Sequence, residues 1–143
     1  MRTIKACATV LLIALAAILL WEAAWTFLTP TRFHARYFPQ CEKVYARYAE
    51  VLSAVLPRFQ AEDAPEQERQ MLCEGLSAYV KGETPEDRII LIPVADIGDF
   101  YRQSYTYGLV WAADLSRLID KNPGIILTAL ENGWCAYCLT TPQ

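Results

Sequence analysis

The hydrophobic positions of this chain begin with one long run near the N-terminus. Residues 6–28 carry a single charge, Glu22, and Pro30 follows shortly after them. At 1.5 Å per residue a helix of this length extends about 34 Å, enough to cross a hydrocarbon core of about 30 Å. We therefore predict a transmembrane signal anchor over residues 6–28, preceded by a short tail of residues 1–5.

The residues at the two ends of this run bear on where the membrane interface lies and on whether the run is cleaved. Trp21 and Trp25 lie one helical turn apart near its C-terminal end, where amphipathic rings favour the membrane interface. A cleaved signal peptide is the alternative, because Arg2 and Lys5 form a basic segment directly before the apolar run. Cleavage requires small residues at −3 and −1, and the candidate sites are interrupted by Glu22 or Trp25. We expect the anchor to stay uncleaved.

Flanking charge alone does not orient the anchor, because basic residues stand on both sides of it. Arg32, Arg36 and Lys43 follow the run and balance Arg2 and Lys5 under the positive-inside rule. The short N-terminal tail and the cysteines favour a domain on the outer, oxidising side. Low Lys with high Ala and Arg is typical of a GC-rich bacterium. We expect a single-pass protein of the bacterial inner membrane whose domain faces the periplasm.

Helical periodicity dominates the first part of the domain. Residues 29–38 are aromatic and basic and predict a juxtamembrane linker. Residues 39–56 place apolar side chains at i, i+3, i+4 and i+7, which predicts an amphipathic helix. A second helix is predicted with Asp63 as its cap, Pro65 in its first turn and Gly82 after its end.

The next two segments predict a strand and a third helix. Residues 88–94 are rich in Ile and Val, which is typical of a buried strand, and Pro93 confines that strand to an edge or an end. Residues 99–120 predict the third helix, which the Asn-Pro-Gly sequence at residues 122–124 would end.

The C-terminal pattern predicts a β-hairpin. Two apolar segments, residues 125–130 and 134–140, flank Asn132-Gly133, a pair that favours a tight turn between antiparallel strands. Residues 39–143 are therefore predicted to form a single disulfide-containing α+β domain. We expect about three helices, the C-terminal β-hairpin and one further short strand.

Composition narrows the classes of function. About 113 residues remain after the anchor region, which suits one domain. Residues 30–143 hold 11 basic and 15 acidic side chains, a net charge of about −4. Such a domain has no electrostatic reason to bind nucleic acid or anionic lipid.

A Cys-x-x-Cys pair near the C-terminus is the sharpest chemical signal. The sequence Trp-Cys-Ala-Tyr-Cys at residues 134–138 resembles the active site of the thioredoxin family. That resemblance implies thiol–disulfide exchange by Cys135 and Cys138. It covers only these five residues. In the family the motif opens a helix early in the domain, whereas here only five residues follow Cys138. A membrane-tethered thiol–disulfide oxidoreductase is therefore the alternative function.

Structural disulfides are the preferred interpretation of the cysteines. In an extended strand Cys135 and Cys138 point to opposite faces, so each would pair elsewhere. Cys41 and Cys73 fall on inward faces of the predicted helices, and bonds from these helices to the hairpin are favoured over a Cys41–Cys73 bond. The connectivity stays open. Zinc held by the four thiolates is a further alternative, although structural zinc sites usually have two Cys-x-x-Cys pairs.

No catalytic, cofactor or metal site is predicted. The single histidine, His34, lies in the linker, which excludes most catalytic triads and dyads that use a histidine. In the predicted third helix Tyr101 and Tyr105 share a face beside Arg102, a combination typical of protein-binding hot spots. We therefore expect a binding or accessory protein whose partner is another membrane or periplasmic protein. A subunit, an assembly factor and an immunity or exclusion protein all fit this description.

Overall fold

The structure, a computed structural model, describes residues 2–61, 69–98 and 103–142. The chain forms two compact units, residues 1–36 and residues 37–143. The architecture is α+β, as predicted, with a long N-terminal helix and a six-stranded antiparallel sheet.

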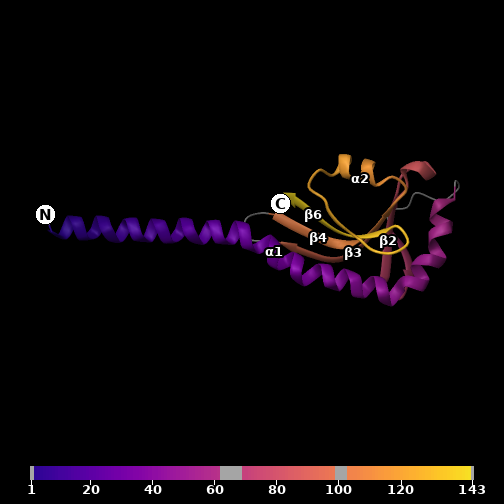
Figure 1. Cartoon of the computed structure of the whole chain (residues 1–143), viewed down its shortest axis with the longest axis horizontal. Helices are drawn as coiled ribbons and strands as arrows, with labels where there is room; N and C mark the ends of the chain where they lie inside the picture. Colours follow the sequence, from indigo (N-terminus) through magenta and orange to yellow (C-terminus); the bar gives the residue numbers. More distant parts are fainter. Residues whose placement is uncertain (1, 62–68, 99–102, 143) are drawn as a thin grey trace. The chain divides into compact units, whose positions relative to one another are not determined.

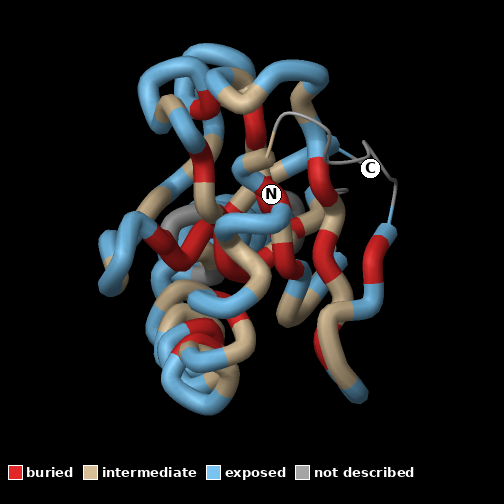
Figure 2. Tube along the Cα trace, turned by 90° about the vertical axis from the view of Figure 1, so that its right-hand side faces the viewer, coloured by how far each residue is buried: buried red, intermediate tan, exposed pale blue. Residues whose placement is uncertain are grey.

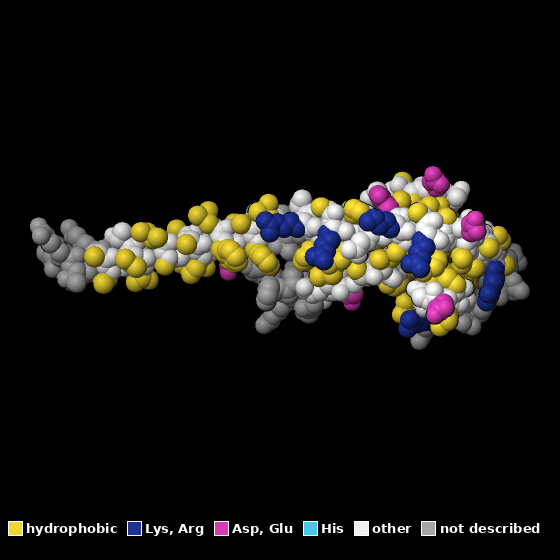
Figure 3. Space-filling view, turned by 90° about the horizontal axis from the view of Figure 1, so that it is seen from below, with side chains coloured by type: hydrophobic (Ala, Val, Ile, Leu, Met, Phe, Trp, Pro, Cys, Tyr) yellow, Lys and Arg dark blue, Asp and Glu magenta, His cyan; other side chains and the backbone are white. Residues whose placement is uncertain are grey.

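The N-terminal unit consists of the apolar part of helix α1, which begins at Arg2 and ends at Gln60. Its hydrophobic side chains are exposed along this part, as Figure 3 shows, and Leu11 and Leu20 are each 71% exposed. In the described part of the chain, this is the one helix long and apolar enough to cross a membrane. The rings of Trp21 and Trp25 stack with centroids 5.9 Å apart.

The predicted linker, residues 29–38, is helical and belongs to α1. Pro30 does not end the helix. A proline inside a helix removes one hydrogen bond and costs about 3 kcal/mol, which disfavours the helix without forbidding it. Within the second unit, Tyr37 and Phe38 pack against Tyr107 with ring centroids 5.2 and 5.6 Å apart, respectively, so this end of the predicted linker is part of the folded domain.

The helix predicted over residues 39–56 is confirmed as the C-terminal part of α1, which continues to Gln60. One stripe of this part packs on the sheet, and the exposed positions between its members carry most of the charges. The buried members follow the spacing expected of an amphipathic helix. They are Cys41, Tyr45, Leu52 and Phe59.

The sheet has the strand order β1-β2-β3-β4-β6-β5, and every neighbouring pair is antiparallel. In the second unit, α1 runs along one face and the short helix α2 covers part of the other (Figure 1). A single 3-10 turn, η1, precedes β3. The bounds are β1 Gln70–Cys73, β2 Leu76–Lys81, η1 Pro85–Asp87, β3 Ile89–Gly98, β4 Gln103–Ala112, α2 Leu115–Lys121, β5 Ile126–Ala129 and β6 Trp134–Pro142.

Strand alternation divides the core between the two faces of the sheet. Ile90, Leu109 and Ala136 are buried on the face toward α1. The opposite face carries a cluster that includes Val110 and Leu118, the latter from α2. Figure 2 colours the buried residues red, and they alternate with less buried ones along the strands.

The predicted second helix is wrong, because residues 70–81 form the β1–β2 hairpin instead. Leu76, Ala78 and Val80 are buried in strict alternation, a period of two that the helical interpretation overlooked. Gly75 has a φ of +81° and makes the turn between the strands. The predicted cap Asp63 lies outside the described residues, as does Pro65.

The predicted third helix is also wrong over most of its length. Residues 103–112 form β4, in which Tyr105, Tyr107 and Leu109 are buried on one face. Aromatic residues at alternate positions favour a strand, and tertiary pairing with β3 and β6 overrides the helical pattern. Only the last turns of the prediction survive as α2, which ends before Asn122 as expected.

The predicted strand over residues 88–94 is confirmed within β3, although β3 is an inner strand rather than an edge. Pro93 lies where the β3–β4 register shifts, and a missing N–H is tolerated at such an irregularity. The C-terminal hairpin is confirmed as β5 and β6. Asn132 and Gly133 both have positive φ, as a tight turn of this kind requires.

Candidate functional site

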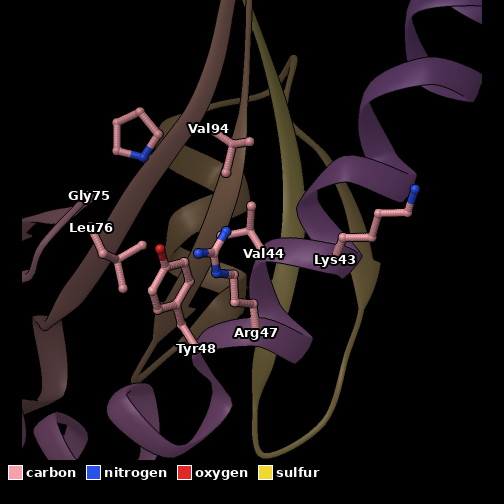
Figure 4. A pocket seen from close by; sticks show the side chains of 8 residues that line it. Lys43, Val44, Arg47, Tyr48, Gly75, Leu76 and Val94 are labelled. Atoms are coloured by element: carbon pink, nitrogen blue, oxygen red, sulfur yellow. The ribbon is translucent and has the colours of Figure 1, made fainter.

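A concave surface lies between α1, the β1–β2 turn and β3. We call this surface the α1 groove, and its volume is about 300 Å³. It combines basic and aromatic side chains with apolar ones (Figure 4). Its lining residues are Lys43, Val44, Arg47, Tyr48, Gly75, Leu76, Pro93 and Val94.

Local structure brings the polar side chains of the α1 groove together. Lys43 and Arg47 are four residues apart, so they lie on one side of α1. The Arg47 guanidinium carbon is 5.4 Å from the centroid of the Tyr48 ring, a cation–π arrangement. Figure 4 shows the Arg47 guanidinium beside Tyr48, whereas Lys43 extends away from them. The Tyr48 hydroxyl approaches the turn, where a Cβ on Gly75 would lie 3.6 Å from its oxygen.

A second hollow of about 370 Å³ adjoins the α1 groove and shares Gly75 and Pro93 with it. Arg69 lines this hollow and donates from Nη2 to the Ser77 hydroxyl at 3.4 Å. Met71, on the edge strand β1, is 78% exposed there. The two hollows meet at Gly75 and Pro93, on either face of the sheet edge formed by β1 and β2, and together they hold three basic side chains and exposed apolar area.

The charge of this surface is opposite to that of the domain as a whole. Residues 37–143 hold 9 basic and 15 acidic side chains, a net charge of −6. None of the described residues that line the two hollows is acidic. Figure 3, which looks onto the α1 side, shows Lys and Arg side chains along the helix, with Asp and Glu side chains on the surrounding surface. The surface is therefore a local basic area on an acidic domain.

The predicted interaction residues do not form this surface. Tyr101 and Arg102 lie outside the described residues. Tyr105 is 4% exposed in β4, and its hydroxyl donates to Oε1 of Gln103 at 3.0 Å. The expectation that Tyr105 is exposed on a helix is wrong, because the segment is an inner strand.

The Cys-x-x-Cys pair is arranged as the strand geometry predicts. Cys135 packs in the α2-side cluster with Val110, while Cys138 lies on the face toward α1. Burial raises the pKa of both thiols, and the exposed fractions of the two residues are 6% and 0%. Reactive cysteines need an accessible thiolate, and these two provide neither access nor a lowered pKa. The arrangement does not favour the oxidoreductase alternative.

The structure brings only some of the predicted disulfide candidates together. All five cysteines are free thiols. Cys41 and Cys138 are both buried on the α1 side of the sheet. Cys73 lies on the edge strand β1 and not on a helix, which corrects its predicted setting. Within residues 2–61, 69–98 and 103–142, no group of three or more His, Cys, Asp or Glu side chains is placed to hold a metal ion.

Comparison with known proteins gives no relative. No family model matches the chain, and neither a curated protein nor a solved structure matches it. Interpretation of function therefore depends on the α1 groove and the candidate membrane span. Sequence reasoning missed this groove, and the only local signal was the four-residue spacing of Lys43 and Arg47.

Proposed function

We propose that this chain is a membrane-anchored binding protein that docks on another protein of the bacterial envelope. In this proposal the α1 groove and its adjoining hollow receive a segment of the partner that carries acidic and apolar side chains. The observation that carries the proposal is the basic, aromatic and apolar surface formed by Arg47, Tyr48, Arg69 and Met71 on an otherwise acidic domain.

Physical complementarity supports a protein segment as the ligand. Arg and Tyr are enriched among the residues that dominate protein–protein binding. Charge complementarity between a basic groove and an acidic segment speeds association and rejects basic partners. The adjoining hollow includes Met71 of the edge strand β1, so an extended segment, which can follow a strand edge, fits this surface better than an enclosed small molecule does.

The proposed location is the bacterial inner membrane, with a single span and the domain in the periplasm. The apolar part of α1 supports the span, and its exposed side chains need a covering that lipid provides. The cysteine content supports an outward-facing domain. A subunit, an assembly factor or an immunity protein would each use the groove in the same way.

Photocrosslinking in native membranes tests this function. A benzoylphenylalanine at Met71 probes the second hollow and leaves all three basic side chains in place. The matched probe at Ile119, which is 46% exposed on α2, samples a surface outside both hollows. We expect a discrete crosslinked partner from position 71 and none from position 119. Equal labelling from both positions, or a chain recovered alone from both, would contradict the proposal.

Charge reversal tests the proposed chemistry of recognition. In the chain with the probe at Met71, Arg47→Glu should lower the crosslinking yield about tenfold, a loss of about 1.4 kcal/mol. Arg58→Glu is the matched control, because Arg58 lies on the same helix without lining either hollow. Equal yields for the two variants would rule out the α1 groove as the docking surface.

A further inference from the structure

Two fully buried thiols, from elements far apart in the sequence, lie on the same side of the sheet. Cys41 belongs to α1 and Cys138 to β6, and each is 0% exposed. Cys138 is the direct cross-strand partner of Tyr107 in β4. Both Tyr107 and Cys138 therefore point toward α1.

Aromatic packing places Cys41 over this part of the sheet. The Tyr107 ring contacts Tyr37 and Phe38, with centroids 5.2 and 5.6 Å apart. Cys41 follows these two residues by about one helical turn, on the same stripe of α1. Burial raises the pKa of Cys138, and hydrogen bonding with the Tyr107 and Thr140 side chains partly offsets this. Cys41 and Cys138 lie close enough for the thiolate of Cys138 to contribute, after burial, to the raised pKa of Cys41.

The other cysteines are separated from this pair by the sheet itself. Cys135 points to the α2 side. Cys73 lies on β1, and three strands stand between β1 and β6 in the sheet. Cys7 belongs to the other compact unit. Of the four candidates, Cys41 and Cys138 are the two that share one buried environment.

We propose that Cys41 and Cys138 form a disulfide that joins α1 to β6 when the chain folds in an oxidising compartment. Its formation in the cell rests on the periplasmic orientation proposed above, whereas the pairing itself rests on the fold. Each thiol loses one proton, and the pair loses two electrons to the disulfide of an exchange catalyst or of oxidised glutathione. The sulfur–sulfur bond of that oxidant breaks as the new one forms.

The burial of the two thiols in the folded domain determines when the disulfide forms. Burial, together with the neighbouring Cys138, raises the pKa of Cys41 to about 11. Because the thiolate is the attacking species, exchange is slow once α1 covers the sheet. The bond therefore forms during folding, while both thiols are still exposed. After folding, the same burial protects it from reductants.

Disulfide mapping on the full wild-type chain tests the pairing. The chain is unfolded with its thiols reduced and refolded in detergent with a glutathione redox buffer, and its free thiols are then alkylated under denaturing conditions. Digestion with trypsin and chymotrypsin, which cleaves after Tyr137, separates Cys135 from Cys138 for mass spectrometry. We expect a Cys41–Cys138 crosslink, with Cys7, Cys73 and Cys135 alkylated. Alkylated Cys41 and Cys138, or a bond to any other cysteine, would overturn the proposal.

Matched variants give a second measurement. Oxidation should raise the urea midpoint of the wild-type chain and of Cys135→Ser, and it should leave that of Cys41→Ser unchanged. Each variant is compared with its own reduced form, so a general loss of stability does not affect the result. A midpoint shift retained in Cys41→Ser would refute the pairing.

Mapping the chain taken directly from cells separates this inference from the proposed orientation. A crosslink that forms on refolding and is absent in cells would contradict the periplasmic domain and leave the pairing intact. Absence of the crosslink in the refolded chain would refute the pairing and leave the orientation standing.

Discussion

Gly108 controls how closely β4 approaches its two neighbouring strands. A Cβ at this position would lie 2.2 Å from the Ile92 carbonyl oxygen and 2.8 Å from Cε1 of Tyr137. The Tyr137 ring therefore occupies the space that a side chain would need. Since the carbonyl belongs to the paired strand β3, relief would require a backbone shift in the centre of the sheet.

Replacing Gly108 tests this close approach. We expect Gly108→Ala to lower the free energy of unfolding by about 1–3 kcal/mol, because it overpacks a buried site. Gly124→Ala is the matched control, since nothing lies within 4 Å of a Cβ there, and it should change stability by less than about 0.5 kcal/mol. Urea titration of both full chains, followed by tryptophan fluorescence, gives the comparison. Similar losses of stability in both variants would show that the close contact at Gly108 does not cause the loss.

At the scale of elements, α2 is a short helix that is stabilised by contacts near its N-terminal end. The Asp114 carboxylate accepts hydrogen bonds from the backbone N–H groups of Ser116 and Arg117, at 3.0 and 3.4 Å. Arg117 also pairs with Asp87 and so ties α2 to the 3-10 turn η1. A seven-residue helix has little stability of its own, so these contacts keep it folded over the sheet.

The Asp114 cap makes the stability of α2 depend on pH, in a direction that follows from the pKa of Asp114. The hydrogen bond from the Ser116 hydroxyl, followed by that from the Arg117 N–H, lowers the pKa of Asp114 below its ordinary value. The stabilisation is therefore complete above the ordinary carboxyl pKa and is lost as pH falls through the lowered one. Amide hydrogen exchange should show less protection of α2 in Asp114→Ala at pH 7, and the difference should shrink on acidification. Asp120→Ala should keep the protection, and an equal loss there would contradict the cap.

At the scale of the whole molecule, helix α1 has an exposed apolar part and a part that packs on the sheet. The described side chains of α1 before residue 25 are exposed, and most of them are apolar, whereas its part within residues 37–60 buries one stripe against the sheet. The first part is stable only where its apolar surface is covered, and the second part completes a folded core. The chain therefore combines a candidate membrane span with a folded domain.

Charges placed in the middle of the apolar run test the span. Each central Arg or Asp costs about 2.5–3.5 kcal/mol in a transmembrane helix, so the double variant Leu12→Arg, Ile18→Asp should lose membrane insertion. Leu12→Ala, Ile18→Ala is the control and should stay inserted. The measurement is the fraction that remains in the membrane pellet after a carbonate wash. Equal retention of both double variants would show that this segment is not the anchor.

The elements that could be predicted from the sequence are those whose signals are local. The apolar run needs no tertiary partner to be recognised, and neither does the amphipathic stripe over residues 39–56. The turn at Asn132-Gly133 follows from the positive φ that these two residues tolerate. Strand alternation also placed Cys135 and Cys138 on opposite faces.

Tertiary structure decided what local pattern left ambiguous. Residues 70–81 and 103–112 carry apolar positions that fit both a helix and a strand, and pairing with β3 and β6 selected the strand. The α1 groove and the Cys41–Cys138 environment each join segments that are distant in the sequence. Such sites arise only when the sheet order brings those segments together. The sequence by itself thus determined the long apolar helix, the first domain helix and the last hairpin, while the fold alone determined which residues meet across the sheet.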